Sequence, residues 1–503
     1  MLPGLEFLAG VLSEGCDQVD VGTLLEKLPT RPSNIVESVA APTVTFHGLA
    51  VRASASKGQC FVLVDRQWTA YWRRVARWSE GSAPDVVRQA KGNGAKCIVV
   101  AEAQLSSEVR EAAEGANLLV VKSTLEFFYQ AGRAIRLASG VRLTMVTGSV
   151  GKTTTKDMIA HALRSLGHLT FSTAKSQNVP VRVVSNVAAA EGYEYAVIEA
   201  SHGTFKRFAR ASYSLSADVA VVTAISESHL ASIGTLEDVA ELKSGVFSDP
   251  PPGGVAVICL DVPYADLLVR RATLAGRQIV TYGESRDATI RLVSYDAEAR
   301  RVTAQVGDTM LSYSLSIDGR HNAINSLAVI ATLRAYGLSD WGKGVKSLHT
   351  LRPRAGRGER RKLQVGDSIR VDVIDEAFNA NPASVAAALA TLEAVPLSQP
   401  SRKIAVLGDI LELGQEAERI HRSLAPVIRG ANIDGVLLFG PEMHALHDEL
   451  CRTETPHSYF ADVDALVASF PTLLRDGDLL LAKASHRTGL GEWIRENTTE
   501  TLE

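Results

Sequence analysis

A glycine-rich stretch from Thr144 to Thr155 contains the residues whose types and spacing most directly predict chemistry. An apolar run from Val141 to Val146 predicts a buried strand, and a helical pattern of apolar residues follows the glycines. A glycine turn between a strand and a helix presents backbone N–H groups and the helix N-terminus to phosphate. We expect Lys152 to bridge the outer phosphates of a nucleotide and the Thr153 hydroxyl to bind Mg²⁺. The predicted nucleotide-binding residues here are Gly148, Ser149, Gly151, Lys152, Thr153 and Thr154.

The loop is shorter than the common phosphate-binding loop, which has four residues between its two glycines. Here Gly148 and Gly151 enclose only two residues. A tight strand-to-helix turn with a surface lysine is therefore an alternative interpretation. The predicted strand before the loop and the helix after it, which ends near Gly167, favour the nucleotide site.

Two further predicted strands end in residues that could bind a metal ion beside this loop. Tyr193 to Glu199 predicts a strand that ends in a carboxylate, and the strand from Ala217 to Val222 leads towards His229. Ligands of parallel sheets bind at the carboxyl ends of the strands, and a carboxylate there suits Mg²⁺. Histidine is a less usual magnesium ligand. Chemistry alone therefore leaves His229 equally open as a surface or hydrogen-bonding residue.

The elements that must position these residues follow an α/β pattern. Strands and helices alternate from residue 141 to about 350, as in a doubly wound, mostly parallel sheet. Period-two segments at 289–294, 301–306 and 310–316 predict an antiparallel patch, and a helix is expected from Asn322 to Tyr336. Alternation resumes beyond the proline- and arginine-rich segment 351–361, which predicts a linker.

We expect three domains in the 503 residues. They are a small α/β N-terminal domain at 1–140, a central P-loop domain at 141–354 and a Rossmann-like C-terminal domain at 355–503. In the first domain, Val44 to Leu49 and Cys60 to Val64 predict short strands. Its tryptophans, Trp68, Trp72 and Trp78, are expected to pack in a core, with the cover of a pocket as the alternative.

The composition excludes several classes of protein. Hydrophobic residues make up 46% of the chain, charged residues 22%, and the net charge is −3. The chain has no excess of basic residues that would indicate a nucleic-acid partner. It also has no run that approaches the ~18 apolar residues of a membrane span. The N-terminus has no basic region typical of a signal peptide. Five cysteines without a C-x-x-C pair favour neither structural zinc nor a disulfide framework, and we expect a cytoplasmic protein.

The segment from His229 to Lys243 resembles the part of Mur ligases that contains a metal-binding histidine and a downstream lysine. The short phosphate loop is also the form found in Mur ligases and folylpolyglutamate synthetases. The resemblance implies that Glu199 and His229 hold one Mg²⁺ and that carbamylated Lys243 holds another. Carbamylation converts a cation into a carboxylate-like anion, which is a hard oxygen ligand. From the sequence alone, a solvated helix lysine would be the preferred interpretation of Lys243.

Further segments match this family in the same order along the chain. Gly319 to Asn325 is similar to the family element G-x-H-N-x-x-N, and Gly356-Arg357 resembles an interdomain pair whose arginine reaches ATP phosphate. Asp375 to Ser384 and Leu407 to Gly414 resemble motifs of the MurF branch, which adds D-Ala-D-Ala to the UDP-N-acetylmuramoyl tripeptide. The resemblance implies that the nucleotide is also bound by Asn322, Asn325, Arg357 and Asp375.

The sequence departs from the MurF pattern in two places. Where the family binds its UDP-sugar through a Ser-Arg pair, this chain has Arg52-Ala53. Near the C-terminus, the expected Lys-Gly-Ser-Arg is replaced by Lys483-Ala-Ser-His486-Arg487. The catalytic motifs are therefore retained, whereas the region that holds the acyl substrate differs.

The resemblance implies a MurF-like, ATP-dependent ligase that joins a small-molecule carboxylate to an amine through an acyl phosphate. ATP and two Mg²⁺ ions are the expected cofactors, and Lys152, His229 and Lys243 are the expected catalytic residues. A MurF paralogue could use the same chemistry for a secondary metabolite or modified amino acid. A non-catalytic nucleotide-binding partner subunit is a further alternative. No nucleic-acid or membrane partner is expected, and we expect a monomer or a weak homo-oligomer.

Overall fold

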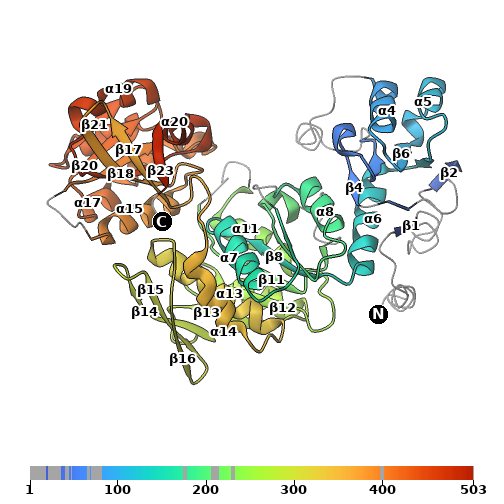
Figure 1. The fold of residues 1–503 in the computed structure, drawn as a ribbon, viewed down its shortest axis with the longest axis horizontal. Helices are drawn as coiled ribbons and strands as arrows, with labels where there is room; N and C mark the ends of the chain where they lie inside the picture. Colours follow the sequence, from blue (N-terminus) through green and yellow to red (C-terminus); the bar gives the residue numbers. More distant parts are fainter. Residues whose placement is uncertain are drawn as a thin grey trace.

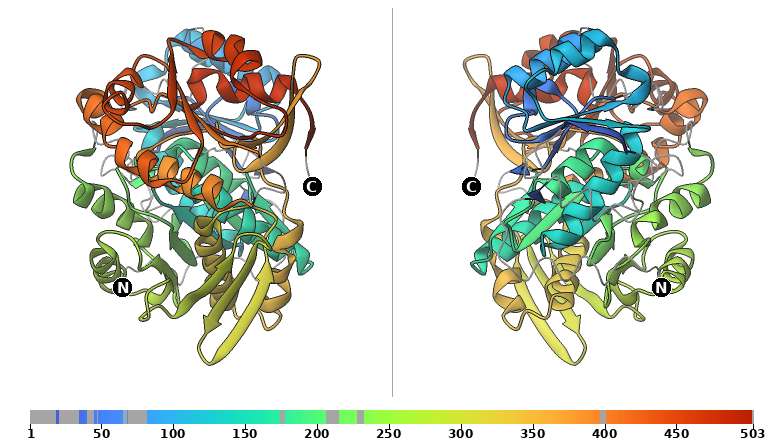
Figure 2. Two further views of the ribbon diagram at one scale, coloured as in Figure 1. Left: turned by 90° about the vertical axis from the view of Figure 1, so that its left-hand side faces the viewer. Right: turned by 90° about the vertical axis from the view of Figure 1, so that its right-hand side faces the viewer.

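The computed structural model contains three lobes, each built around one large sheet (Figure 1). The N-terminal and C-terminal lobes lie at opposite sides of the central one, and the antiparallel part of the central sheet projects at its lower edge in Figure 2. The structure describes residues 19–20, 35–39, 45–46, 48–64, 68, 82–173, 178–205, 215–227, 233–396 and 401–501.

The central lobe is a nine-stranded sheet in the order β16-β15-β14-β13-β12-β11-β8-β10-β9. The strands from β9 to β14 are parallel, and β14 to β16 are antiparallel, which confirms the predicted antiparallel patch. The strands are β8 Arg142–Thr147, β9 Thr170–Ser172, β10 Tyr195–Glu199, β11 Val219–Val222, β12 Val255–Cys259, β13 Gln278–Gly283, β14 Ile290–Asp296, β15 Arg301–Val306 and β16 Thr309–Ser314. The helices are α7 Lys152–Ser165, α8 Pro180–Ala188, α11 Leu236–Ser244, α12 Ala265–Leu274, α13 Arg320–Ala335 and α14 Trp341–Lys346.

Helices cover both faces of this sheet because successive strand side chains point to opposite faces. Val146 and Val197 pack into a core with α7 and α13. Met145 and Ile198, one position away on the same strands, pack into a second core with α8, α11 and α12. The predicted doubly wound sheet is therefore confirmed, and β8, which the phosphate loop follows, is an inner strand between β11 and β10.

The N-terminal lobe has a five-stranded sheet in the order β2-β7-β6-β5-β4, and β1 pairs separately with β3. The predicted strand from Val44 to Leu49 is wrong as a single element, because β3 and β4 belong to different sheets and Gly48 between them has φ +75°. Trp68 is fully buried, whereas Trp72 and Trp78 lie outside the described residues. The elements are β1 Val19–Asp20, β2 Ile35–Val39, β3 Thr45–Phe46, β4 Leu49–Ala50, β5 Cys60–Val62, α4 Ala83–Gly92, β6 Cys97–Ala101, α5 Ser107–Ala112, β7 Leu118–Val121 and α6 Thr124–Ala138.

The C-terminal lobe has a seven-stranded sheet in the order β21-β20-β19-β22-β18-β17-β23. The predicted linker 351–361 is too long, because β17 begins at Glu359 and pairs antiparallel with both β18 and β23. The strands are β17 Glu359–Val365, β18 Ile369–Asp375, β19 Lys403–Gly408, β20 Gly435–Phe439, β21 His457–Phe460, β22 Leu479–Lys483 and β23 Thr498–Thr501. The helices are α15 Pro382–Ala394, α16 Ala417–Arg422, α17 Ala425–Gly430, α18 His444–Leu450, α19 Val463–Leu473 and α20 Leu490–Asn497.

Specific contacts join the lobes. On the N-terminal side, α6 packs on α8 so closely that a Cβ at Gly132 would lie 2.5 Å from Val184 Cγ1. On the C-terminal side, Arg354 donates from Nη2 to Asp157 Oδ1 of α7 at 2.6 Å and to Thr173 O at 3.0 Å. The ion pair with Asp157 fixes the linker against the helix that follows the phosphate loop. Across the described residues, no helix is both long and apolar enough to span a bilayer.

Candidate active site

The phosphate loop runs from Gly148 to Gly151 between β8 and α7, and both glycines have positive φ, +153° and +80°. A Cβ at Gly148 would lie 2.0 Å from Thr223 Oγ1 and 2.9 Å from Ala224 N. A Cβ at Gly151 would lie 2.9 Å from the Asn325 amide. Glycine is therefore needed for close approach as well as for backbone conformation.

Lys152 folds back over this loop. Its Nζ donates to Gly148 O at 2.8 Å and to Ser149 O at 3.1 Å. Burial lowers the pKa of Lys152 to about 8, and the nearby Glu199 carboxylate opposes that shift. An ammonium group that is poorly solvated in this way gains strongly from a bound polyanion.

Hard oxygen donors lie together beside Lys152. The Thr153 hydroxyl donates to Glu199 Oε2 at 2.5 Å, and Asn178 Nδ2 donates to Glu199 Oε1 at 2.9 Å. Glu199 is fully buried at the carboxyl end of β10. A hydroxyl and a buried carboxylate next to a phosphate loop form a donor set that fits Mg²⁺. His229, the other predicted ligand, lies outside the described residues.

Lys243 reaches the same loop from α11. The residue is 3% exposed, so its interpretation as a solvated helix lysine is wrong. Its Nζ donates to Gly148 O at 2.9 Å, so one carbonyl accepts from both Lys243 and Lys152. Burial, with the charge of Lys152, lowers the pKa of Lys243 well below its ordinary value. Burial therefore favours the neutral amine at Lys243 more than solvent would.

Helix α13 contributes the predicted asparagines. The Asn325 amide lies against Gly151, and Asn322 donates from Nδ2 to Asp318 O at 2.7 Å. Gly319, which precedes this helix, has φ +102° and approaches Thr391 of α15, so the start of α13 meets the C-terminal lobe. The helix thereby connects the phosphate loop with the neighbouring lobe.

The C-terminal lobe places two cations opposite the phosphate loop. The Arg357 guanidinium lies 4.2 Å from the centre of the Phe378 ring, a cation–π contact. Lys483 Nζ donates to Asn379 O at 2.9 Å and lies 3.3 Å from Glu376 Oε2. Both cations face a cavity that also receives the phosphate loop.

This cavity, with a volume of about 330 Å³, lies between the central and C-terminal lobes. Its size is in the range of small-molecule sites. Among the predicted nucleotide-binding residues, those lining it are Ser149, Gly151, Lys152, Thr153, Thr154, Asn322, Asn325 and Arg357. Gly148, Glu199 and Lys243 do not line it but bond to residues of the loop and its helix.

Asp375, also predicted to bind the nucleotide, does not line the cavity. The residue is fully buried at the end of β18, where its Oδ1 accepts from Ala377 N at 3.0 Å and its Oδ2 lies 3.5 Å from Arg495 Nη1. Burial raises the pKa of this carboxyl group. In this structure Asp375 fixes the turn after β18, and its contact with a nucleotide stays a prediction.

The sequence-based site omitted several residues that line the cavity, including Asn178, Thr223, His321, Glu376 and Lys483. The motif positions of His321, Glu376 and Lys483 could have identified them, because each lies inside a segment that resembles the family. Asn178 and Thr223 gave no comparable signal. Thr223 meets the site because β11 lies beside β8 in the sheet, and Asn178, just before α8, meets it through its bond to Glu199 at the end of β10.

Replacing Gly148 with alanine should destabilise the central lobe by at least about 2 kcal/mol, because the new Cβ meets both a side chain and a backbone nitrogen. Gly167→Ala is the matched control, since Gly167 has φ +88° but no atom within 4 Å of the added Cβ. That variant should lose only about 1 kcal/mol from backbone strain. Denaturant unfolding of both variants measures the difference, and equal losses would contradict the packing argument.

Comparison with known proteins identifies the family. The family model described as Mur ligase middle domain matches residues 146–333, and that described as Mur ligase, glutamate ligase domain matches residues 356–486. The UDP-N-acetylmuramoyl-tripeptide–D-alanyl-D-alanine ligase of Bacillus subtilis is 30% identical over 392 residues, covering 76% of this chain and 81% of the relative. The chain belongs to the Mur ligase family. The predicted resemblance is thereby confirmed, and the protein is an ATP-dependent amide-bond-forming ligase.

Other relatives agree with the MurF branch. The ligase of the same name from Escherichia coli is 27% identical and covers 82% of this chain and 87% of the relative. The structure of MurF from Acinetobacter baumannii has a TM-score of 0.72 at 22% identity, covering 89% of this chain and 92% of that one. MurF from Thermotoga maritima in complex with ADP has a TM-score of 0.69 at 21% identity, with coverages of 90% and 96%. These structures show that the three-lobed fold is that of the Mur ligases.

Proposed function

We propose that the protein ligates a carboxylate to an amine through an acyl phosphate and releases ADP and phosphate. The observation that supports this best is the cavity between the lobes, which is lined by the phosphate loop on one side and by Arg357 and Lys483 on the other. Phosphoryl transfer depends mainly on positioning and on stabilising negative charge. A cavity with cations on both sides suits a triphosphate whose terminal group is transferred to a carboxylate.

Each residue of the site has a proposed role. Lys152 and Arg357 neutralise the charge that develops on the transferred phosphoryl group, and Asn322 and Asn325 position the nucleotide. Lys483 faces the opposite end of the cavity, beside Glu376 and Asn379. Closure of the C-terminal lobe on the phosphate loop would exclude water and so protect the acyl phosphate from hydrolysis.

Thr153 and Glu199 are the proposed protein ligands of Mg²⁺, together with His229 as the resemblance implies. Bound there, the cation would supply positive charge to the phosphate oxygens. Carbamylated Lys243 is the proposed ligand of a second ion. The buried Lys243 side chain supports this role, because burial favours the neutral amine that reacts with CO₂, and its Nζ shares the Gly148 carbonyl with Lys152.

We propose that the substrates are the two that appear in the relatives' name, UDP-N-acetylmuramoyl tripeptide and D-Ala-D-Ala. Support comes from the region where the N-terminal lobe meets α8. Burial and the positive charge of Arg52 lower the pKa of Arg182, so the two guanidinium groups lie within electrostatic range. Two cations on facing lobes suit an anionic acyl substrate such as one containing a diphosphate.

A second candidate is a MurF paralogue with a different carboxylate substrate. Ala53 occupies the position of the family arginine, is 3% exposed, and has no polar side chain to offer. Each lost charge-assisted hydrogen bond would cost about 1.5–3 kcal/mol of binding. The third alternative, a non-catalytic partner subunit, is disfavoured by the retained arrangement of Lys152, Glu199 and Lys243. A monomer or weak homo-oligomer stays a prediction.

With the muramoyl tripeptide and D-Ala-D-Ala, we expect ATP to be cleaved to ADP and phosphate, with neither product formed when one substrate is omitted. Coupled ADP assays and phosphate assays measure this directly. AMP and pyrophosphate in a productive reaction would exclude the acyl-phosphate mechanism. The tripeptide without its nucleotide is the comparison substrate. Its preferential use would favour the paralogue.

Arg52→Ala is the variant that separates the two candidates, and Lys57→Ala, an exposed lysine in the same turn, is its control. If Arg52 binds the diphosphate, its loss should raise the KM for the nucleotide-linked substrate by about 10-fold or more without lowering kcat. If the variant has an unchanged KM and turns over efficiently, Arg52 does not bind the substrate.

A further inference from the structure

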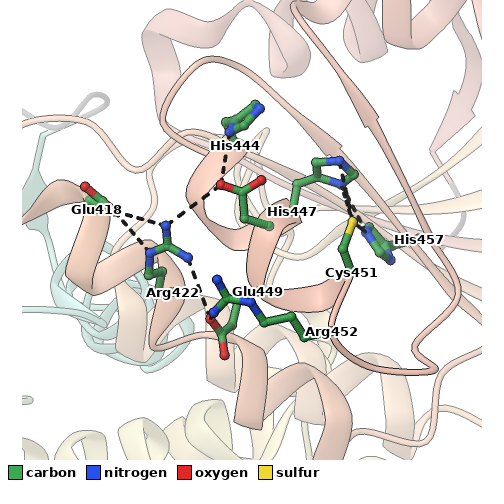
Figure 3. Close-up of polar contacts among 9 residues, drawn as sticks. Glu418, Arg422, His444, His447, Glu449, Cys451, Arg452 and His457 are labelled. Atoms are coloured by element: carbon green, nitrogen blue, oxygen red, sulfur yellow. Dashed lines mark hydrogen bonds and ion pairs between the residues drawn. The ribbon is translucent and has the colours of Figure 1, made fainter.

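Three potential metal ligands lie together at the outer edge of the C-terminal lobe, outside the nucleotide cavity (Figure 3). His447 and Cys451 are four residues apart on α18 and at its end, so they share one side of the helix. The chain then returns to β21, the edge strand of the seven-stranded sheet, whose first residue is His457. The helix and the strand thus bring a thiol and two imidazoles to one place.

The distances within this group fit a shared ion. His447 Nδ1 lies 3.0 Å from His457 Nε2, and Cys451 Sγ lies 3.7 Å from His457 Nε2 and 3.8 Å from His447 Nδ1. Tetrahedral zinc, with bonds of about 2.0–2.1 Å to nitrogen and 2.3 Å to sulfur, separates its ligands by about 3.3 Å for N–N and 3.6 Å for N–S. Shifts of a few tenths of an ångström would therefore place all three atoms around one ion.

The surrounding contacts orient the two rings. His457 Nδ1 lies 2.9 Å from Thr455 O, a carbonyl oxygen that can only accept a hydrogen bond. The neutral tautomer with its hydrogen on Nδ1 makes this bond, and its Nε2 then has the lone pair that faces His447 and Cys451. Metal-binding histidines characteristically donate their second ring N–H to such an acceptor. The His447 ring stacks on Tyr459 with centroids 5.2 Å apart and an interplanar angle of 22°.

The nearby acidic side chains are engaged elsewhere. Asp448 pairs with His444 at 3.4 Å, and Glu449 pairs with Arg452 at 2.9 Å (Figure 3). Arg422 lies between both carboxylates, at 3.8 and 3.6 Å. The sulfur of Cys451 and the two imidazoles are donors of the kind that select zinc-class ions over Mg²⁺.

We propose that His447, Cys451 and His457 form a binding site for a divalent ion of the zinc class, separate from the magnesium-type donors at the phosphate loop. Cys451 is exposed, which leaves a fourth position open to water. The ion would connect the C-terminal end of α18 to β21 and so fix the intervening segment 452–456. The lack of C-x-x-C pairs in the sequence does not exclude this site, because two of its three ligands are histidines.

Cobalt titration of the full-length protein tests this proposal. The protein is first stripped with a chelator and kept in excess Mg²⁺ to occupy the hard-oxygen site. We expect one Co²⁺ per chain with a thiolate-to-cobalt charge-transfer band, displaced stoichiometrically by Zn²⁺. Cys451→Ser should abolish the band, and His457→Gln should weaken binding at least about 10-fold, the smallest loss typical even of groups that only support a ligand.

His444→Gln is the matched control, because His444 is on the same helix and contacts the His447 ring but pairs with Asp448. The His444→Gln variant should bind Co²⁺ with the same affinity as the unmodified protein. Thermal melts of the metal-free variants identify any that fail to fold, and Cys451→Ser, an exposed conservative change, is expected to melt normally. The proposal is overturned if the unmodified protein shows no thiolate band. It is equally overturned if Cys451→Ser binds as tightly as the unmodified protein, or if His444→Gln loses as much affinity as His457→Gln.

Discussion

Replacing Lys152 with alanine should lower kcat/KM for ATP by at least about 100-fold, a loss of about 3 kcal/mol of transition-state stabilisation. Lys152 Nζ lies over the phosphate loop, on the carbonyls of Gly148 and Ser149, where it can bind the outer phosphates. Removing it leaves the loop backbone but eliminates the cation that we propose neutralises the transferred phosphoryl group. Steady-state ADP release measures the effect, and a normal melting curve shows that the fold persists.

The same lysine predicts a pH dependence. Its pKa in the free enzyme is about 8, and bound ATP would raise that value by supplying negative charge. ATP binding above pH 8 must therefore take up a proton, so affinity should fall by up to about tenfold per pH unit until the pKa of the complex is reached. Calorimetry in buffers of different ionisation enthalpy measures this uptake. Lys152→Ala should lose the dependence, and an unchanged pH profile would contradict the assignment.

Lys243→Ala should be nearly inactive, and small carboxylates such as acetate or formate should restore part of its activity. The reason is that the proposed carbamate of Lys243 supplies an anionic oxygen ligand, which a small carboxylate in the vacated space can imitate. Because Lys243 is buried beside Gly148 O, its removal leaves a space at the loop itself. Rates with and without added carboxylate, at fixed ionic strength, test the prediction.

Lys243→Arg is the informative control, because it keeps a cation at this position but cannot form the carbamate and leaves no space for acetate. We expect it to be inactive and not rescued. Depleting the buffer of CO₂ should also slow the unmodified enzyme, and ¹³C NMR with labelled bicarbonate should detect the carbamate. Full activity of Lys243→Ala without added carboxylate would exclude Lys243 from the reaction.

The sequence alone determined the phosphate loop and the central sheet around it. Their signals are local, since an apolar strand, two glycines and an amphipathic helix are adjacent in the chain. The predicted strand from Val141 to Val146 and the observed β8, Arg142–Thr147, differ by one residue at each end. The motifs also singled out Asn322, Asn325 and Arg357, which the structure brings to the cavity, and their contact with a nucleotide stays a prediction.

Only the tertiary structure decided which distant residues meet. β17 was missed because its sequence is rich in charged residues, which are depleted in strands; it pairs with β18 as a local hairpin and with the distant β23. Three further features depend on how the elements pack. They are the burial of Lys243 on Gly148 O, the position of Asp375 outside the cavity lining, and the grouping of His447 with Cys451 and His457. Periodicity and propensity describe one segment at a time. The chemistry of this site depends on charges brought together from separate lobes, which only packing defines.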